Sequence, residues 1–75
     1  MKELVEYVAR GLVEHPDQVR VTEIQQGNLI IYELEVASDD MGKVIGRQGR
    51  VINALRALVK AAAVRRGVRV NVEVV

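Results

Sequence analysis

The sequence contains no cysteine among its 75 residues, which excludes a disulfide framework, a zinc–thiolate site and a cysteine nucleophile. Other residues that commonly carry chemistry are scarce, because the chain has one histidine (His15), one serine (Ser38) and one proline (Pro16). Acid–base catalysis needs convergent carboxylates or a placed histidine, and no cluster shows metal-ligand spacing. The sequence therefore predicts neither catalytic residues, nor a metal site, nor a cofactor.

Aromatic residues and long apolar runs are also rare. Aromatics make up 3% of the chain, with Tyr7 and Tyr32 but no Trp or Phe. Binding folds that stack nucleobases on exposed rings are therefore not indicated. No apolar run approaches the roughly 18 residues of a membrane span, and the acids within residues 1–15 are unlike a signal peptide. We expect a cytoplasmic protein with no membrane partner.

Positive charge is almost missing from the first half of the chain. Residues 1–40 hold three basic and nine acidic side chains, a net charge of −6, whereas residues 41–75 hold eight basic side chains and one acid, a net charge of +7. The total of +1 hides this division. Such a division arises by chance in small proteins or marks a binding surface, and the charge pattern alone leaves both open.

Apolar periodicity predicts the secondary structure. A helix occupies residues 1–15, with Leu4, Val5, Val8 and Leu12 on its apolar stripe, and stops where His15 precedes Pro16. A hairpin spans 19–36 around a turn at Gly27-Asn28. A short helix starts at residues 38–41, a longer helix runs from 50 to 66, and an alternating strand covers 68–74. The core face of the longer helix is expected to comprise Ile52, Leu55, Leu58, Val59, Ala62 and Ala63.

Several local details follow from residue type. His15, next to a proline at a helix end, is expected to cap carbonyl groups rather than to take part in chemistry. Ile24 lies out of phase with Val21, which predicts a bulge near Glu23. Ser38 has the residue type of a helix cap. Tyr32 shares the phase of Leu34 and is expected in the core.

The element order is helix, strand, strand, short helix, helix, strand. It predicts an α+β fold with a three-stranded mixed sheet and helices on one face, formed by one domain over residues 1–75. The last two strands enclose the two helices, so they should be parallel and joined by a right-handed crossover.

The most distinctive segment is Gly42-Lys43-Val44-Ile45-Gly46-Arg47-Gln48-Gly49-Arg50. Its glycines permit a tight turn and close approach of a ligand, and the following helix N-terminus favours an anion. The spacing does not fit a Walker A loop or a dinucleotide fingerprint. A plain connection between two helices with solvated charges is the alternative, but the bracketing basic residues favour a phosphate-backbone clamp.

Val44-Ile45-Gly46-Arg47-Gln48-Gly49-Arg50 resembles the V-I-G-x-x-G-R signature of KH domains, whose G-x-x-G loop clamps nucleic-acid backbone. The element order matches the type II KH fold. The resemblance extends along the chain to the small bacterial KhpA family, through His15-Pro16-Asp17, Tyr32-Glu33-Leu34 and Lys60-Ala61-Ala62-Ala63.

This resemblance implies a binding groove between the loop on one side and the second strand, with the turn before the third, on the other. Ile45 and Ile52 would form an apolar floor for bases, with Val44 and Val36 nearby. Arg65-Arg66-Gly67 would form a very short variable loop, which implies weak sequence discrimination. The residues implied to contact RNA are Lys43, Ile45, Gly46, Arg47, Gln48, Gly49, Arg50, Ile52, Asn53 and Arg56.

The resemblance further implies a non-catalytic protein that binds single-stranded RNA, with a role in RNA chaperoning or post-transcriptional regulation and a link to cell shape and cell wall biogenesis. Relatives of this kind pair with themselves or with a larger, KhpB-like KH protein. The alternative function is therefore a protein-interaction module acting chiefly through homo- or heterodimerisation. The exposed edge expected at the last strand is compatible with this alternative.

Overall fold

The computed structural model describes residues 1–75 and contains three helices and three strands. The helices are α1 (Lys2–Leu12), α2 (Met41–Ile45) and α3 (Arg50–Arg66), and the strands are β1 (Arg20–Gln26), β2 (Leu29–Glu35) and β3 (Arg69–Val74). Short 3₁₀ turns are present at η1 (Pro16–Gln18), η2 (Ser38–Asp40) and η3 (Arg47–Gly49). The predicted α+β element order is confirmed.

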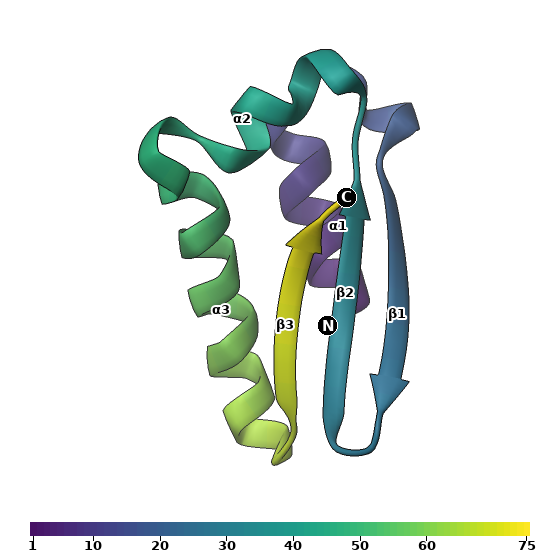
Figure 1. Ribbon diagram of the computed structural model, residues 1–75, viewed down its shortest axis with the longest axis vertical. Helices are drawn as coiled ribbons and strands as arrows, with labels where there is room; N and C mark the ends of the chain where they lie inside the picture. The colour runs from purple at the N-terminus through teal and green to yellow at the C-terminus, as the bar shows by residue number, and fades with distance from the viewer.

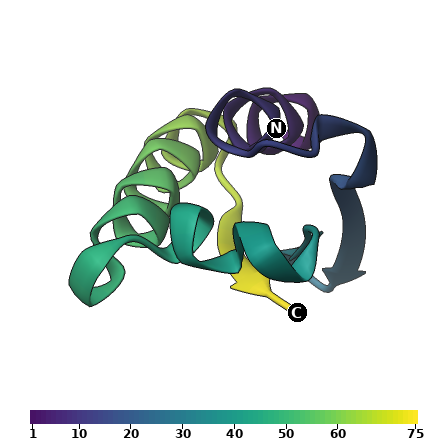
Figure 2. The same cartoon turned by 90° about the horizontal axis from the view of Figure 1, so that it is seen from above.

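The strands form one mixed sheet in the order β1-β2-β3. β1 pairs antiparallel with β2 through the predicted turn at Gly27-Asn28, whereas β2 pairs parallel with β3. Helices α1 and α3 lie on the same side of the sheet, and α2 crosses its upper end, where β2 and β3 end (Figures 1 and 2). The crossover thus places the segment 42–50 at the carboxyl ends of the parallel pair.

The core lies between the sheet and the two longer helices. Tyr32 is 1% exposed, as the strand phase predicted. The other members are apolar side chains from every element: Val5, Ala9, Val19, Val21, Leu34, Val36, Val44, Ile52, Leu55, Val59, Ala63, Val70 and Val72. None of the helices combines the length and the hydropathy that crossing a bilayer requires.

Two predictions are wrong, one about the core face of α3 and one about the pairing of β1 with β2. Leu58 was expected inside but is 54% exposed, because the buried positions of α3 recur at Ile52, Leu55, Val59 and Ala63 and leave residue 58 on the outer face. Ala62 is likewise only half-buried. The bulge near Glu23 is also absent, since β1 and β2 pair without interruption from Arg20–Glu35 to Gln26–Leu29. Ile24 therefore lies opposite Ile31, out of phase with Val21 and on the other face of the sheet.

Two predictions about helix ends also fail. Ser38 does not cap a helix with its side chain, because it belongs to η2, and the residue that precedes α2 is Asp40. Helix α1 ends at Leu12, before the proline, and is followed by an extended Val13. His15 therefore lies beyond the reach of the helix carbonyls, and its ring contacts Asp39 instead.

Candidate nucleic-acid interface

The glycine segment forms a sharp, open reversal between α2 and α3. Gly46 ends α2 with φ 75° and ψ 170°, Gln48 has φ 58° and ψ 25°, and Gly49 has φ 74° and ψ 16°. The backbone of Gly46 lies in a region that only glycine occupies without strain. A Cβ there would meet Cγ2 of Val51 and lie 2.9 Å from its backbone nitrogen. Gly46 thus brings the loop against the first turn of α3.

The N-terminus of α3 opens directly onto this reversal. Gly49 precedes the first residue of α3, and no side chain caps the helix. The early N–H groups of a helix have no intrahelical partner and, with the helix dipole, favour an anion such as phosphate. The helix that begins at this end, α3, is 17 residues long. The loop and the helix end therefore expose backbone N–H groups of the kind that favour an anion.

The basic side chains of the loop carry uncompensated charge. Arg47, Gln48 and Arg50 are exposed, and neither arginine lies within ion-pair distance of a carboxylate. Of the eight basic side chains after residue 40, only Lys43 takes part in an ion pair, with Nζ 2.6 Å from Glu14 Oε1. The two arginines are therefore available to phosphate groups, whereas Lys43 is bound to an acid of the N-terminal half.

The structure leaves one of the two expected apolar floor residues at the surface. Ile45, at the end of α2, is 36% exposed. Ile52 is 5% exposed because it packs in the core, and its neighbour Val44 is 1% exposed. Apolar surface next to the loop thus comes from Ile45, while Ile52 and Val44 anchor the two helices that carry the loop.

The strand that faces the loop-bearing helix is β3 rather than β2. The crossover puts β2 in the centre of the sheet, paired on both sides. Both β1 and β3 are edge strands, and β3 is the one that lies beside α3 (Figure 1). Arg56 joins these two elements, because its Nε donates to the carbonyl of Val72 at 3.0 Å and its Nη1 donates to Asn53 Oδ1 at 3.2 Å. The expected groove beside the second strand is therefore corrected to one beside the third.

A separate crevice lies further along α3 than Arg56. It has a volume of about 500 Å³ and lies between the second half of α3 and the start of β3. Its basic groups are Lys60 and Arg69, neither of which is ion-paired. The full lining is Leu29, Lys60, Ala63, Val64, Val68, Arg69, Val70 and Asn71. The loop, Arg56 and this crevice together follow one side of α3.

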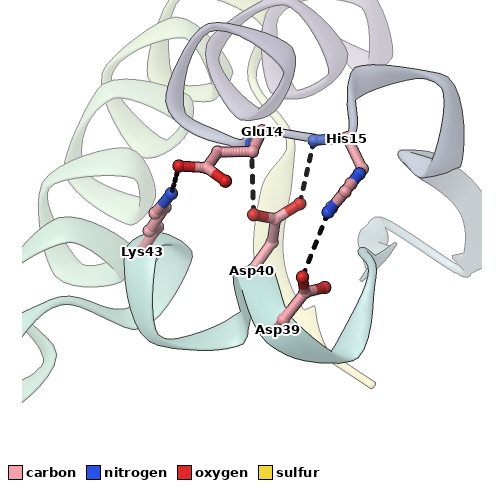
Figure 3. A network of polar contacts seen from close by, with 5 residues as sticks. All are labelled: Glu14, His15, Asp39, Asp40 and Lys43. Carbon is pink, nitrogen blue, oxygen red and sulfur yellow. Dashed lines mark hydrogen bonds and ion pairs between the residues drawn. The ribbon is translucent and has the colours of Figure 1, made fainter.

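A polar cluster that the sequence did not predict joins the segment after α1 to the start of α2 (Figure 3). Asp40 is 1% exposed, and its two oxygens accept the backbone N–H groups of Glu14 and His15, each at 3.1 Å. His15 Nε2 lies 3.1 Å from Asp39 Oδ2. The ligand-type atoms of His15, Asp39 and Asp40 lie within 4.8 Å of one another. His15 and Asp40 are about 25 residues apart in the sequence, so motifs of local spacing could not predict this cluster.

The pair of His15 and Asp39 makes stability depend on pH. The hydrogen bond and the negative charge of Asp39 raise the pKa of His15, and the hydrogen bond from His15 lowers the pKa of Asp39. A raised histidine pKa stabilises the fold fully below the unfolded value of about 6.5, and a lowered aspartate pKa does so above about 3.9. The pair therefore contributes fully between these values and less as pH rises through the folded pKa of His15.

We expect the urea midpoint to be higher at pH 5.5 than at pH 8.5, with a His15→Gln variant showing a smaller difference. The comparison between the variant and the wild type isolates the contribution of the imidazole. Equal pH dependence in both proteins would contradict the assignment.

A three-stranded mixed sheet with a glycine reversal between the two crossover helices is the architecture of a type II KH domain. The family described as "KhpA/KhpB, KH domain" matches residues 2–74, so the chain belongs to this family. Among similar proteins, the RNA-binding protein KhpA of Clostridium acetobutylicum is 52% identical over 75 residues and that of Caldanaerobacter subterraneus is 55% identical, each with 100% of both chains covered. That of Chlamydia pneumoniae is 47% identical over 74 residues, 99% of this chain and 95% of that protein.

A solved structure supports the fold independently of sequence. The crystal structure of Aquifex aeolicus Era bound to GDP and AlF₄⁻ superimposes with a TM-score of 0.68 at 19% identity. The match covers 97% of this chain and 28% of that one. At this identity, the likeness concerns the fold alone.

Proposed function

We propose that the chain is a non-catalytic protein that binds single-stranded RNA in the cytoplasm, acting as one KH domain over residues 1–75. The observation that carries the proposal is the reversal at Gly46–Gly49, where two unpaired arginines flank the open N-terminus of α3. The relatives named RNA-binding protein KhpA support the choice of RNA. A role in RNA chaperoning or post-transcriptional regulation is what the resemblance to the KhpA family implies, and low sequence discrimination is compatible with that role.

The proposed RNA path starts at the loop and follows α3. Gly46 and Gly49 admit the sugar-phosphate backbone, Arg47, Gln48 and Arg50 contact phosphates, and Ile45 contacts a base. Asn53 and Arg56 come next along the helix, and Lys43 contributes if phosphate displaces Glu14. The path then enters the crevice between α3 and β3. Ile52 is buried and helps to fix α3 beneath this path.

Two features of the path favour binding with little sequence preference. Most contacts are directed at the backbone, and the chain has no exposed aromatic ring beside the loop on which to stack bases. The turn between α3 and β3 consists of Gly67 and Val68 and offers few side chains for reading base edges.

Titration of a labelled hexamer of single-stranded RNA, monitored by fluorescence anisotropy, tests this function. Each phosphate contact contributes about −0.7 to the slope of log K against log salt concentration for single strands. With two or three contacts at the loop, we expect a slope of about −1.4 to −2. An RNA duplex should compete weakly. Absence of saturable binding at low salt would contradict the proposal.

A second candidate function, dimerisation, rests on the outer face of α3. The side chains Ala54, Ala57, Leu58 and Ala61 recur at helical spacing and are all exposed. Val64 continues this row at the border with the crevice, which it also lines. Leu58 is 54% and Val64 is 78% exposed. A contiguous apolar face left exposed on a helix often marks a site of protein interaction. We infer that this face packs against another copy of the chain or against a related KH protein.

A charge in the middle of this face is expected to separate the copies. The variant Ala57→Glu should raise the dimer dissociation constant at least about tenfold, which corresponds to about 1.4 kcal/mol. The position is exposed, so folding should be retained. Sedimentation velocity checks this result, with Tyr7→Glu on α1 as the matched control. A wild-type chain that sediments as a monomer at every accessible concentration would leave dimerisation without support.

A further inference from the structure

We propose that Asp40 is a positioning residue for RNA binding, which fixes the direction of α2 and thereby the place of the Gly46–Gly49 loop, by holding the backbone of Glu14 and His15. This inference rests on the proposed function.

The side chain of Asp40 forms its hydrogen bonds away from the helix that it precedes. It directly precedes α2, where an aspartate side chain normally caps the helix. No such cap is present, because both carboxylate oxygens accept N–H groups 25 and 26 residues earlier in the chain. Burial of a carboxylate is costly unless hydrogen bonds compensate, and Asp40 is the one charged side chain in the buried set. Its burial is therefore tied to this long-range contact.

Two flanking contacts reinforce the same junction. On one side, Lys43 of α2 binds Glu14, and on the other, His15 contacts Asp39 of η2 (Figure 3). Two adjacent residues after α1 thus contact three residues at the start of the loop-bearing segment. In Figure 3 all five side chains converge on the gap between these two backbones. We refer to Glu14, His15, Asp39, Asp40 and Lys43 as the clasp.

Helix α2 needs an external anchor because it is short. It has five residues and one buried side chain, Val44. A helix of this length is not stable by itself. The clasp fixes its beginning, and Gly46 follows at its end, so a rotation of α2 would move the loop relative to the N-terminus of α3. Phosphate binding by both elements at once requires their alignment.

The decisive variant is Asp40→Asn, whose amide can accept one N–H group but presents a donor to the other. Removal of a negative charge would by itself strengthen RNA binding. We expect the opposite, a Kd for the single-stranded hexamer that is at least fivefold weaker, at a temperature where the protein is folded. The matched control is Val5→Ala, which weakens the core from α1 but leaves the clasp intact and should keep the wild-type Kd. A folded Asp40→Asn variant with wild-type or tighter Kd would overturn the proposal.

Two further measurements complete the test. If Asp40→Asn does not fold, Asp40→Glu replaces it, with at least a twofold weaker Kd expected and an unchanged Kd contradicting the inference. Amide hydrogen exchange of residues 46–50 is expected to accelerate in the Asp40 variant and not in Val5→Ala. This readout is independent of RNA: a wild type that binds no RNA would refute the proposed function, and unchanged exchange in the folded variant would refute the clasp.

Discussion

Replacement of Arg47 and Gln48 together by aspartate is expected to abolish retention of single-stranded RNA and to leave the circular dichroism spectrum unchanged. Both side chains are exposed and make no hydrogen bond or ion pair within the protein, so their loss removes no internal contact. Gln48 has φ 58°, a conformation that aspartate tolerates better than most residues. The two glycines that shape the loop remain.

The expected loss of affinity is large because the substitution changes the sign of the field at the loop. Two carboxylates would stand where the helix N-terminus and Arg50 attract phosphate, and like charges at a contact repel. We expect Kd to rise at least about tenfold, or about 1.4 kcal/mol. The anisotropy titration measures the change.

A matched control separates the loop from overall charge. Arg10→Asp with Gln18→Asp makes the same change of charge on α1 and η1, at two exposed positions away from the loop. The change at Arg10 also removes its surface ion pair with Glu6, a kind of pair that contributes little to stability. That double variant is expected to bind RNA almost as the wild type does. Equal loss of binding in both double variants would show that net charge, not the loop, governs RNA binding.

Gly46→Ala is expected to have the largest effect on folding among loop substitutions. A residue with a side chain at φ 75° and ψ 170° is strained by about 1–3 kcal/mol. The new Cβ would also lie 2.9 Å from the backbone nitrogen of Val51, which cannot move without displacing α3. Overpacking adds about 1–3 kcal/mol. Together these costs take up much of the stability of a small domain, about 5 kcal/mol at the lower end.

Gly49→Ala provides the comparison within the same loop. Its φ of 74° is also positive, but its ψ of 16° lies in the left-handed helical region, and the nearest atom to a new Cβ is Asn53 Nδ2 at 3.6 Å. The expected cost is about 1–2 kcal/mol from conformation alone. Urea denaturation of both variants checks the order. A Gly49→Ala variant less stable than Gly46→Ala would contradict the geometry of the loop.

The sequence determined the order of elements, the limits of α3 and the position of the glycine loop, because each depends on neighbours in the chain. Apolar alternation predicted the strands, Gly67 ended α3 as expected, and the glycines at 46 and 49 marked the reversal. The division of charge at residue 40 predicted which half would carry most of the basic side chains that form no ion pair. The V-I-G-x-x-G-R motif indicated a KH domain, and the resemblance along the rest of the chain indicated the KhpA family.

Other features could be known only after the chain had folded. The phase of α3 against the sheet left Leu58 outside, the uninterrupted β1–β2 register removed the bulge, and the crossover placed β3 rather than β2 beside the loop-bearing helix. Asp40 looked like part of a helix start, yet its oxygens bind residues 14 and 15. These properties depend on which distant segments meet, and local periodicity carries no information about contacts between residues 25 positions apart.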